Sequence, residues 1–264
     1  MRISLMTTCL VDVMAPDVAR ATVTLLERLG HQVVFDKRQT CCGQMHTNTG
    51  YYSEAAPVVR SFVDTFEPSL DSIDAIVMPS GSCAGCVREQ HQLVAQHEED
   101  AVLEERVAAV SAKTYELSEL LVDVLKVTDV GAYFPHSVTY HPTCHSMRVL
   151  KVGARPLKLL RAVEGIDIRN LPESDSCCGF GGTFSVKNDA TSDAMVTDKA
   201  ANVVSTSAEF VVAGDASCLM NIGGKLRRTN SNATGPQAVH LVQILASTQE
   251  DPFIPSETIL GRAS

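Results

Sequence analysis

The nine cysteines are the residues of this chain whose spacing points most clearly to chemistry. They form two sets, each built around an adjacent pair, Cys41-Cys42 in the first half and Cys177-Cys178 in the second. In the first half, 31 residues separate the pair from the preceding cysteine and 40 separate it from the next one. In the second half these gaps are 32 and 39 residues. The remaining members of the two sets are Cys9, Cys83, Cys86, Cys144 and Cys218. The chain therefore carries two copies of one thiolate-rich site.

Three uses of these cysteines compete. Structural zinc takes four ligands in a tetrahedron and typically uses two separated CxxC pairs, whereas each half has at most one. A dithiol active site at Cys83-x-x-Cys86 leaves Cys9 and the adjacent pair without a role. An iron–sulfur cluster uses every cysteine, because thiolates are its standard ligands. We therefore favour [4Fe–4S] clusters, one or two per chain, with all nine cysteines as ligands, and keep zinc and the dithiol as alternatives.

The two sets differ in number, because Asn221 stands where the second half would carry its fifth cysteine. Four thiolates suffice for a cubane [4Fe–4S] cluster, and five indicate a cluster of unusual shape or a spare thiol. His46, His141 and His145 lie near the cysteines in sequence and could donate to a cluster sulfur or move a proton. Surface or capping roles are the simpler interpretation of these histidines. The sequence identifies no general base, so no catalytic residue is assigned.

The elements that carry the cysteines follow the same order in both halves. Short apolar stretches predict strands that end just before cysteines, at residues 2–8, 32–35, 73–78, 137–141, 165–171 and 209–214. Helical periodicity predicts helices at about 16–30, 55–66, 87–110, 115–125, 156–163, 189–204 and 238–246. Each half thus follows a β-α-β-α-β-α pattern, which favours a small parallel sheet flanked by helices.

The predicted fold class is therefore α/β, with two repeats related by a pseudo-two-fold axis. Open α/β sheets place ligand sites at the carboxyl ends of their strands, which is where the cysteines fall. The first cysteine-rich domain is expected at 1–128, the second at 129–250 and a C-terminal tail at 251–264.

Composition limits the classes of partner and compartment. The net charge of −9 over 264 residues disfavours nucleic acid and anionic membrane surfaces as partners. The sequence lacks an apolar run of 18 residues and begins directly with a strand pattern, so we expect neither a membrane span nor a signal peptide. A cytoplasmic protein is the resulting expectation, and reduced cysteines there favour metal or redox chemistry over disulfides.

Several segments around the cysteines resemble the lactate-utilisation protein A family, which belongs to the proteins built of paired cysteine-rich CCG domains. The segment Cys177-Cys178-Gly179-Phe180-Gly181-Gly182 with the following Thr183-Phe184-Ser185-Val186-Lys187 is the most specific. The other matching segments are Leu25 to Gly30, Gln39 to Gln44, Pro79 to Gly85, Tyr140-His141 with Cys144-His145, and Ser217 to Met220. They spread over most of residues 1–228.

This resemblance implies a cytoplasmic iron–sulfur protein of a three-protein system that oxidises L-lactate to pyruvate. Its implied partners are a ferredoxin-type iron–sulfur subunit and a third small subunit. Related heterodisulfide reductase subunits bind non-cubane [4Fe–4S] clusters at five-cysteine motifs, which Cys9, Cys41, Cys42, Cys83 and Cys86 match. The second set departs from that motif at Asn221, and some relatives with altered motifs hold zinc in one domain.

The leading functional hypothesis is an electron-transfer subunit of an oxidoreductase complex that oxidises L-lactate, a 2-hydroxy acid. A thiol–disulfide reductase subunit of the heterodisulfide reductase type is the rival enzyme. A zinc-stapled interaction module is the rival that is not an enzyme.

Overall fold

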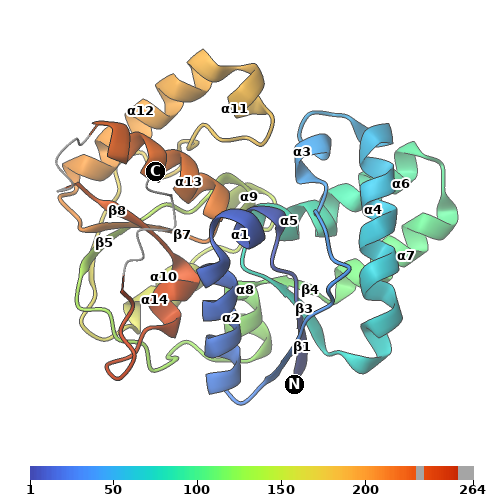
Figure 1. Ribbon diagram of the computed structural model, residues 1–264, viewed down its shortest axis with the longest axis horizontal. Coiled ribbons are helices and arrows are strands. Elements are labelled where there is room, and N and C mark those ends of the chain that lie inside the picture. Colours follow the sequence, from blue (N-terminus) through green and yellow to red (C-terminus); the bar gives the residue numbers. More distant parts are fainter. Residues whose placement is uncertain (230–234, 255–264) are drawn as a thin grey trace.

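Each half of the protein forms a four-stranded parallel sheet flanked by helices (Figure 1). The computed structural model describes residues 1–229 and 235–254. The first sheet has the order β2-β1-β3-β4 and the second the order β6-β5-β7-β8. The strands are β1 (Arg2–Leu5), β2 (Gln32–Val34), β3 (Ala75–Met78), β4 (Thr114–Glu116), β5 (Ser137–Tyr140), β6 (Asp167–Arg169), β7 (Phe210–Ala213) and β8 (Gln237–His240). This confirms the predicted α/β class with two repeats.

The helical segments of the first half connect its strands and continue beyond β4. They are α1 (Cys9–Met14), α2 (Pro16–Arg28), α3 (Gln44–Thr47), α4 (Tyr52–Phe66), the 3₁₀ helix η1 (Glu67–Ser72), α5 (Gly81–Gly85), the π-helical η2 (Cys86–Gln90), α6 (His91–His97), α7 (Ala101–Ala112), α8 (Leu117–Glu119) and the π-helical η3 (Leu120–Val124). Those of the second half are α9 (Cys144–Arg148), α10 (Arg155–Arg161), α11 (Phe184–Lys187), α12 (Asp189–Ser205), α13 (Ala216–Thr229) and α14 (Leu241–Ala246).

Each sheet contains a fourth strand that the sequence pattern did not predict. β4 and β8 lie within stretches whose periodicity predicted helices at 115–125 and 238–246, and in both places the helix begins only after the strand. β4 spans three residues and β8 four, which is too short for a period of two to stand out. Hydrogen bonds from the neighbouring strands β3 and β7 decide the conformation of these segments.

The long helix predicted at 87–110 is also interrupted. α6 ends at His97, and α7 begins at Ala101 with Asp100 as its N-cap. The Asp100 carboxylate accepts a hydrogen bond from Leu103 N at 3.0 Å, which satisfies one of the free N–H groups of the new helix. Most of the predicted tail, residues 255–264, lies outside the described residues.

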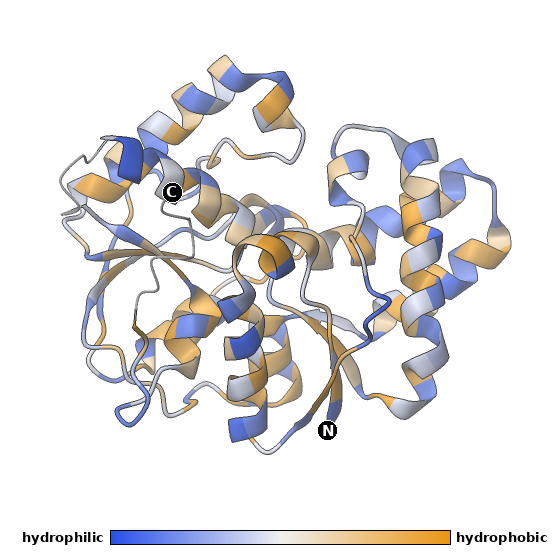
Figure 2. Ribbon diagram, in the orientation of Figure 1, coloured by the Kyte–Doolittle hydropathy of each residue, from blue (hydrophilic) through white to orange (hydrophobic). Residues whose placement is uncertain are grey.

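The largest apolar cluster of the protein is shared by the two halves. The cluster that contains Leu5 and Leu120 of the first half also contains Val138 and Val242 of the second, all of them buried. Figure 2 shows the apolar residues concentrated on the strands and on the inner faces of the helices. Each half also has a further apolar cluster, mostly or entirely from its own residues, but the largest cluster crosses between the halves, so neither half buries all of its apolar surface by itself.

The contacts between the halves are reciprocal. α2 of the first half contacts α14 of the second, and the equivalent helices α10 and α8 contact each other in the same way. The Arg28 guanidinium extends from the end of α2 and donates to the backbone carbonyls of Ala246 and Leu245 at 2.7 and 2.6 Å. Contacts between equivalent helices of the two halves are what a two-fold axis between repeats produces.

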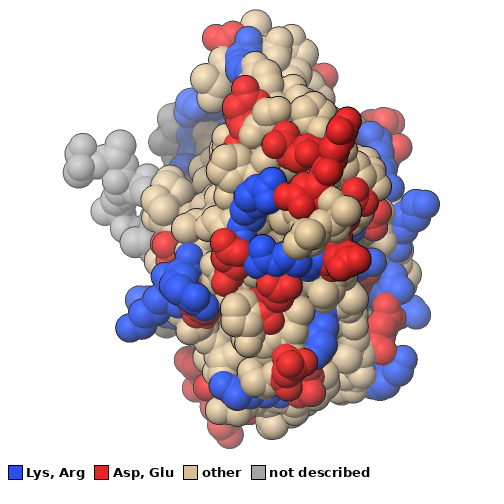
Figure 3. Space-filling model, turned by 90° about the vertical axis from the view of Figure 1, so that its right-hand side faces the viewer, with Lys and Arg blue, Asp and Glu red and all other residues tan. Residues whose placement is uncertain are grey.

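The outer face made by α4, α6 and α7 is charged with both signs interspersed (Figure 3). Arg60 pairs with Asp100 at 2.6 Å, and Arg106 pairs with Asp64 at 2.7 Å. The acidic run at 98–105 belongs to this mixed surface and is at least partly exposed to solvent at Glu99 and Glu105. Within residues 1–229 and 235–254, no helix has the length and apolar character needed to span a bilayer.

Candidate metal centre

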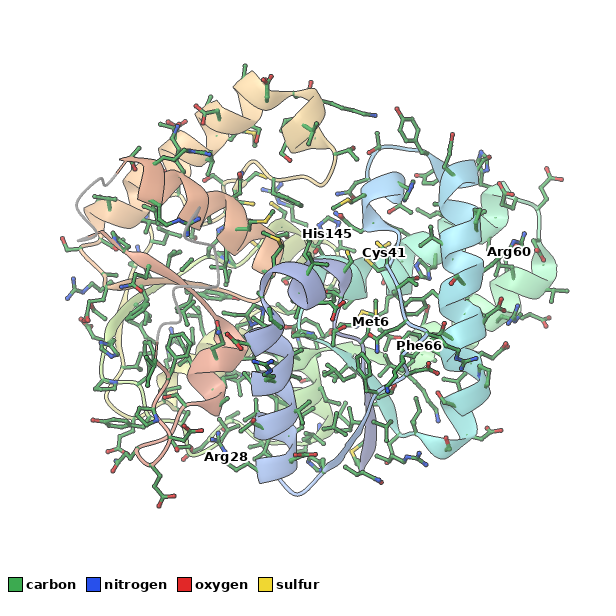
Figure 4. All side chains as sticks on the ribbon, viewed as in Figure 1. Met6, Arg28, Cys41, Arg60, Phe66 and His145 are labelled. Carbon is green, nitrogen blue, oxygen red and sulfur yellow. The ribbon has the colours of Figure 1, made fainter. Side chains whose placement is uncertain are left out.

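Three loops at the carboxyl ends of strands bring the first cysteine set together. Cys9 begins α1 shortly after β1, and the adjacent pair precedes α3. Cys83 lies in α5 after β3, and Cys86 begins the π-helical turn that follows. Figure 4 places Cys41 near the centre of the molecule, between the helices of the two halves. Parallel strands meet at one edge of the sheet, so residues that are distant in sequence converge there.

Backbone turns aim the first set inward. Gly43 has φ of +85°, a left-handed conformation that L side chains rarely adopt. In this turn Gly43 N donates a hydrogen bond to Cys41 Sγ at 3.3 Å. The Cys41 and Cys9 sulfurs lie 3.7 Å apart. The turn therefore supplies an N–H donor to one sulfur while it brings a second sulfur into contact.

The fifth cysteine of the first half is buried and hydrogen-bonded to the pair. Cys86 Sγ donates to the Cys42 carbonyl at 3.2 Å, and His91 Nε2 lies 2.7 Å from the same carbonyl. Thr47 Oγ1 lies 3.6 Å from Cys86 Sγ. Burial acts to raise the pKa of Cys86, but hydrogen bonds with Cys42 and His91 outweigh it and lower the pKa to about 5.

The second set repeats this arrangement with four cysteines. Cys144 begins α9 after β5, the pair precedes α11, and Cys218 lies in α13 after β7. Gly179 has φ of +83° and donates from its N–H to Cys177 Sγ at 3.4 Å. The structure thus brings all nine predicted cysteines into two groups and leaves none elsewhere.

Asn221 occupies the place of Cys86 in the second half and makes the matching hydrogen bond. Its Nδ2 donates to the Cys178 carbonyl at 2.8 Å, as Cys86 Sγ donates to the Cys42 carbonyl. The amide therefore reproduces the structural contact of the fifth cysteine but supplies no sulfur to the site.

The first cysteine of each pair is the one most readily deprotonated. Hydrogen bonds with Cys42 and Cys9 lower the pKa of Cys41. Hydrogen bonds with Cys144 and Cys178 lower the pKa of Cys177 in the same way. Thiolates are the form of cysteine that binds metals and attacks electrophiles. With Cys86, whose pKa is also lowered, the first half therefore holds two thiols that are prepared to start metal binding, and the second half holds one, Cys177.

A cleft between the halves opens beside the first set. Four of its cysteines line the cleft, together with Phe180, Asp215, Ala216 and Ser217 of the second half. The Asp215 carboxylate accepts hydrogen bonds from Ser80 Oγ at 2.5 Å and from Ser82 N at 3.1 Å. Ser80 Oγ in turn accepts from Cys83 N at 3.2 Å. A residue of the second half thus positions the loop that carries Cys83.

The loops that follow the two cysteine pairs also contact each other. Thr49 Oγ1 and Thr183 Oγ1 lie 2.6 Å apart, and Lys187 Nζ donates to the Tyr51 hydroxyl at 2.7 Å. A Cβ built on Gly182 would lie 3.5 Å from the Met45 Cα, so the two backbones approach closely. The loops that carry the two cysteine pairs therefore lie next to each other where the two halves meet.

The donor sets fit thiophilic metal centres. Across the described chain the cysteines are free thiols, and Cys42, Cys83, Cys86, Cys178 and Cys218 are buried. Soft thiolate ligands select zinc, copper(I) and iron–sulfur clusters. The Gly43 and Gly179 N–H groups supply the donors to sulfur that accompany such sites. In the second half the ligand atoms of His141, Cys178 and Cys218 lie within 4.8 Å of one another.

The three histidines noted in the sequence lie in different surroundings. His141 is buried beside the second set, and burial lowers its pKa to about 4, so the ring is neutral at pH 7. His46 follows the first pair in α3, and its charge contributes to the lowered pKa of Cys41. His145 lies in α9 near the centre of the view in Figure 4. The surface or capping role expected of all three does not apply to His141, which is 1% exposed.

Sequence reasoning missed His91, Asp215 and Lys199. Lys199 is fully buried in α12 and lies near the cysteines of the second set, and its Nζ donates to the Glu173 carbonyl at 2.5 Å. Its spacing from Val196 and Val203 places it on the apolar stripe of that helix, which was a usable signal. The roles of His91 and Asp215 depend on contacts between distant segments and left no local pattern.

The fold and the cysteine sites together define a protein of two cysteine-rich CCG domains. The family model described as the cysteine-rich CCG domain matches residues 3–88 and again residues 138–223. The chain is 44% identical to lactate utilization protein A of Oceanobacillus iheyensis over 95% of this chain and 98% of that protein. It is 41% identical to lactate utilization protein A of Bacillus pumilus over 94% of this chain and all of that protein. The chain belongs to the lactate utilization protein A family.

The fold also has a likeness among solved structures. A crystal structure of a hypothetical protein from Helicobacter pylori matches with a TM-score of 0.56 and 10% identity, over 98% of this chain and 50% of that one. At this identity the likeness concerns the fold alone.

Proposed function

We propose that this protein is an iron–sulfur electron-transfer subunit of a complex that oxidises L-lactate to pyruvate. The observation that carries the proposal is the convergence of free cysteines from three loops in each half at the carboxyl edge of a parallel sheet. Membership in the lactate utilization protein A family supports lactate as the substrate of the system. The oxidation releases two electrons and two protons from the hydroxy acid, so a carrier that passes electrons singly suits the reaction.

The residues of the chain have distinct parts in this role. Cys9, Cys41, Cys42, Cys83 and Cys86 would hold a [4Fe–4S] cluster in the first half. Cys144, Cys177, Cys178 and Cys218 would hold the group of the second half. When bound, such clusters supply reversible one-electron transfer. The N–H groups of Gly43 and Gly179 stabilise negative charge on the sulfurs of the pairs.

The expected partners are a ferredoxin-type iron–sulfur subunit and a third small subunit of the same system. The first cysteine set borders the cleft between the halves, so a partner that docks there would approach this set most closely. We place the complex in the cytoplasm.

The direct test is the content of iron, sulfide and zinc, with the visible spectrum, in protein purified anaerobically. We expect about four to eight irons per chain, the range for one or two four-iron clusters. Cys42→Ser and Cys178→Ser should each lose one centre, while Thr47→Ser, which keeps the hydroxyl beside Cys86, should retain both. Zinc in both centres without visible absorbance would contradict the proposal and favour a zinc-stapled interaction module.

A second experiment tests the substrate. The reduced spectrum of the loaded protein is recorded after L-lactate is added with both partner subunits, and D-lactate serves as the control. Reduction by L-lactate supports the proposal. An iron-loaded protein that cleaves a disulfide substrate but is never reduced by a hydroxy acid would favour the thiol–disulfide reductase hypothesis.

A further inference from the structure

The second cysteine site differs from the first at a position that the cysteine pattern does not reveal. His141 N donates to the Val212 carbonyl, as Met6 N donates to the Val77 carbonyl in the first half. Both residues follow the central strand of their sheet and are buried. The second half therefore places an imidazole where the first half places a thioether.

Neither nitrogen of the buried His141 ring makes a hydrogen bond of standard geometry with the described residues, although the Ser174 backbone lies close enough to offset part of the lowering of its pKa. Leaving a buried polar group unsatisfied is unfavourable, because the group loses its hydrogen bonds with water and gains none in the protein. Met6 fills the equivalent position in the first half without such a cost, so packing alone does not account for a histidine here. A buried imidazole without such a partner is free to bind a metal ion or cluster.

The ring also points toward the cysteines. Its ligand nitrogen lies within 4.8 Å of both Cys178 Sγ and Cys218 Sγ, and those two sulfurs lie within the same distance of each other. The Asn221 amide donates its hydrogen bond to the Cys178 carbonyl. The second half therefore has no sulfur at the position that Cys86 occupies in the first half. Neutral imidazole is a common ligand of zinc and of iron, and it replaces thiolate in some iron–sulfur centres.

We propose that His141 is a ligand of the metal centre in the second half, which makes that centre a mixed thiolate–imidazole site with Cys178 and Cys218. The first half, in contrast, holds an all-thiolate site of five cysteines. The inference rests on the proposed function in so far as the second half binds a metal, and it adds the nitrogen ligand. Both an iron–sulfur cluster and zinc bind thiolate and imidazole ligands, and the test below distinguishes between the two.

The experiment compares the wild type with His141→Met and His141→Cys, all purified anaerobically. His141→Met introduces the residue that the first half already buries at this position, so we expect the variant to fold. His141→Cys offers a fifth thiolate and should retain the metal. His145→Gln changes the histidine that follows Cys144 in sequence and is the matched control.

The readout is the ligand itself. For an iron–sulfur centre, pulsed electron paramagnetic resonance on reduced protein labelled with ¹⁵N-histidine reports nitrogen coupled to the cluster. For zinc, X-ray absorption at the zinc edge separates nitrogen from sulfur ligands. We expect a nitrogen ligand in the wild type and in His145→Gln, and its loss in both His141 variants. His141→Met should also release the metal of the second half to a chelator at least about tenfold faster.

Three results would overturn the inference in different ways. A metal that depends on Cys178 but has only sulfur ligands in the wild type would reject His141 as a ligand and leave the proposed function intact. Wild-type protein whose metal content is unchanged by Cys178→Ser would mean that the second half binds no metal, which would reject both proposals for that half. If the nitrogen signal were lost in His145→Gln but kept in the His141 variants, the ligand would be His145 and the inference would be wrong.

Discussion

Glu116 is a buried carboxyl group at the start of α8, where the two halves meet. Its Oε2 accepts hydrogen bonds from Ser118 N at 2.8 Å and from the Ser118 hydroxyl. A Cβ built on Gly214 of the second half would lie 3.7 Å from its Oε1. Burial raises the pKa of Glu116 from 4.5 to about 7, and the neighbouring Glu119 adds to the rise.

A raised pKa in the folded state makes the protein less stable as pH increases. Below pH 4.5 the carboxyl is protonated in both the folded and unfolded states, so it has no effect on the pH dependence. Between 4.5 and about 7 the unfolded chain loses this proton while the folded protein keeps it, which favours unfolding. Because one pKa unit corresponds to about 1.36 kcal/mol, the full loss is about 3 kcal/mol.

We expect Glu116→Gln to remove this dependence while it keeps a side-chain oxygen to accept from Ser118. The free energy of unfolding of the wild type and the variant would be measured by urea denaturation at pH 5 and pH 8. Relative to the wild type, the variant should gain about 2–3 kcal/mol between these two pH values. Effects of pH on the cysteine sites cancel in this difference, because both proteins share every cysteine.

Glu209→Gln is the control, because its pH dependence should lie in acid and leave the comparison of pH 5 with pH 8 nearly unchanged. A backbone hydrogen bond from Ser137 lowers the pKa of Glu209, so its contribution to stability is present above the usual pKa and is lost in acid. If the difference between Glu116→Gln and the wild type were the same at pH 5 and pH 8, Glu116 would not be the buried titrating group that we infer.

Three further changes test the architecture of the sites through urea unfolding midpoints. Gly179→Ala should destabilise the protein by at least about 1 kcal/mol more than Gly43→Ala. The new Cβ at Gly179 would lie 2.6 Å from the Ser192 carbonyl oxygen, whereas the nearest atom at Gly43 is 3.5 Å away. Equal effects of the two substitutions would exclude the clash. Ser80→Ala should cost at least about 1 kcal/mol, because it removes the N-cap of α5 and the hydrogen bond to the buried Asp215, and Ser72→Ala, an exposed serine, should cost less. Arg28→Met should cost about 1 kcal/mol by removing the donors to the end of α14, and Arg20→Met, which loses only a pair within α2, should be close to neutral.

Much of the fold could be predicted because its signals are local. The strands at β1, β3, β5 and β7 are short apolar runs, and α2 begins with Pro16 and carries its apolar residues at helical spacing. The failures at β4 and β8 have one cause, since each strand runs directly into a helix and only its pairing with a neighbouring strand sets its conformation. The break at Asp100 was missed because the capping carboxylate lay within a run of acidic residues.

The sequence by itself determined that there are two cysteine sets, that they repeat and that the second lacks a fifth member. These features depend on residue type and spacing, which are written directly in the chain. The tertiary structure decided how the missing member is replaced, because the contact of Asn221 with Cys178 and the position of His141 beside Cys218 join segments far apart in sequence. It also decided that Asp215 of one half positions the cysteine loop of the other. Such contacts arise only when the shared core brings the two sheets together, so no local pattern records them.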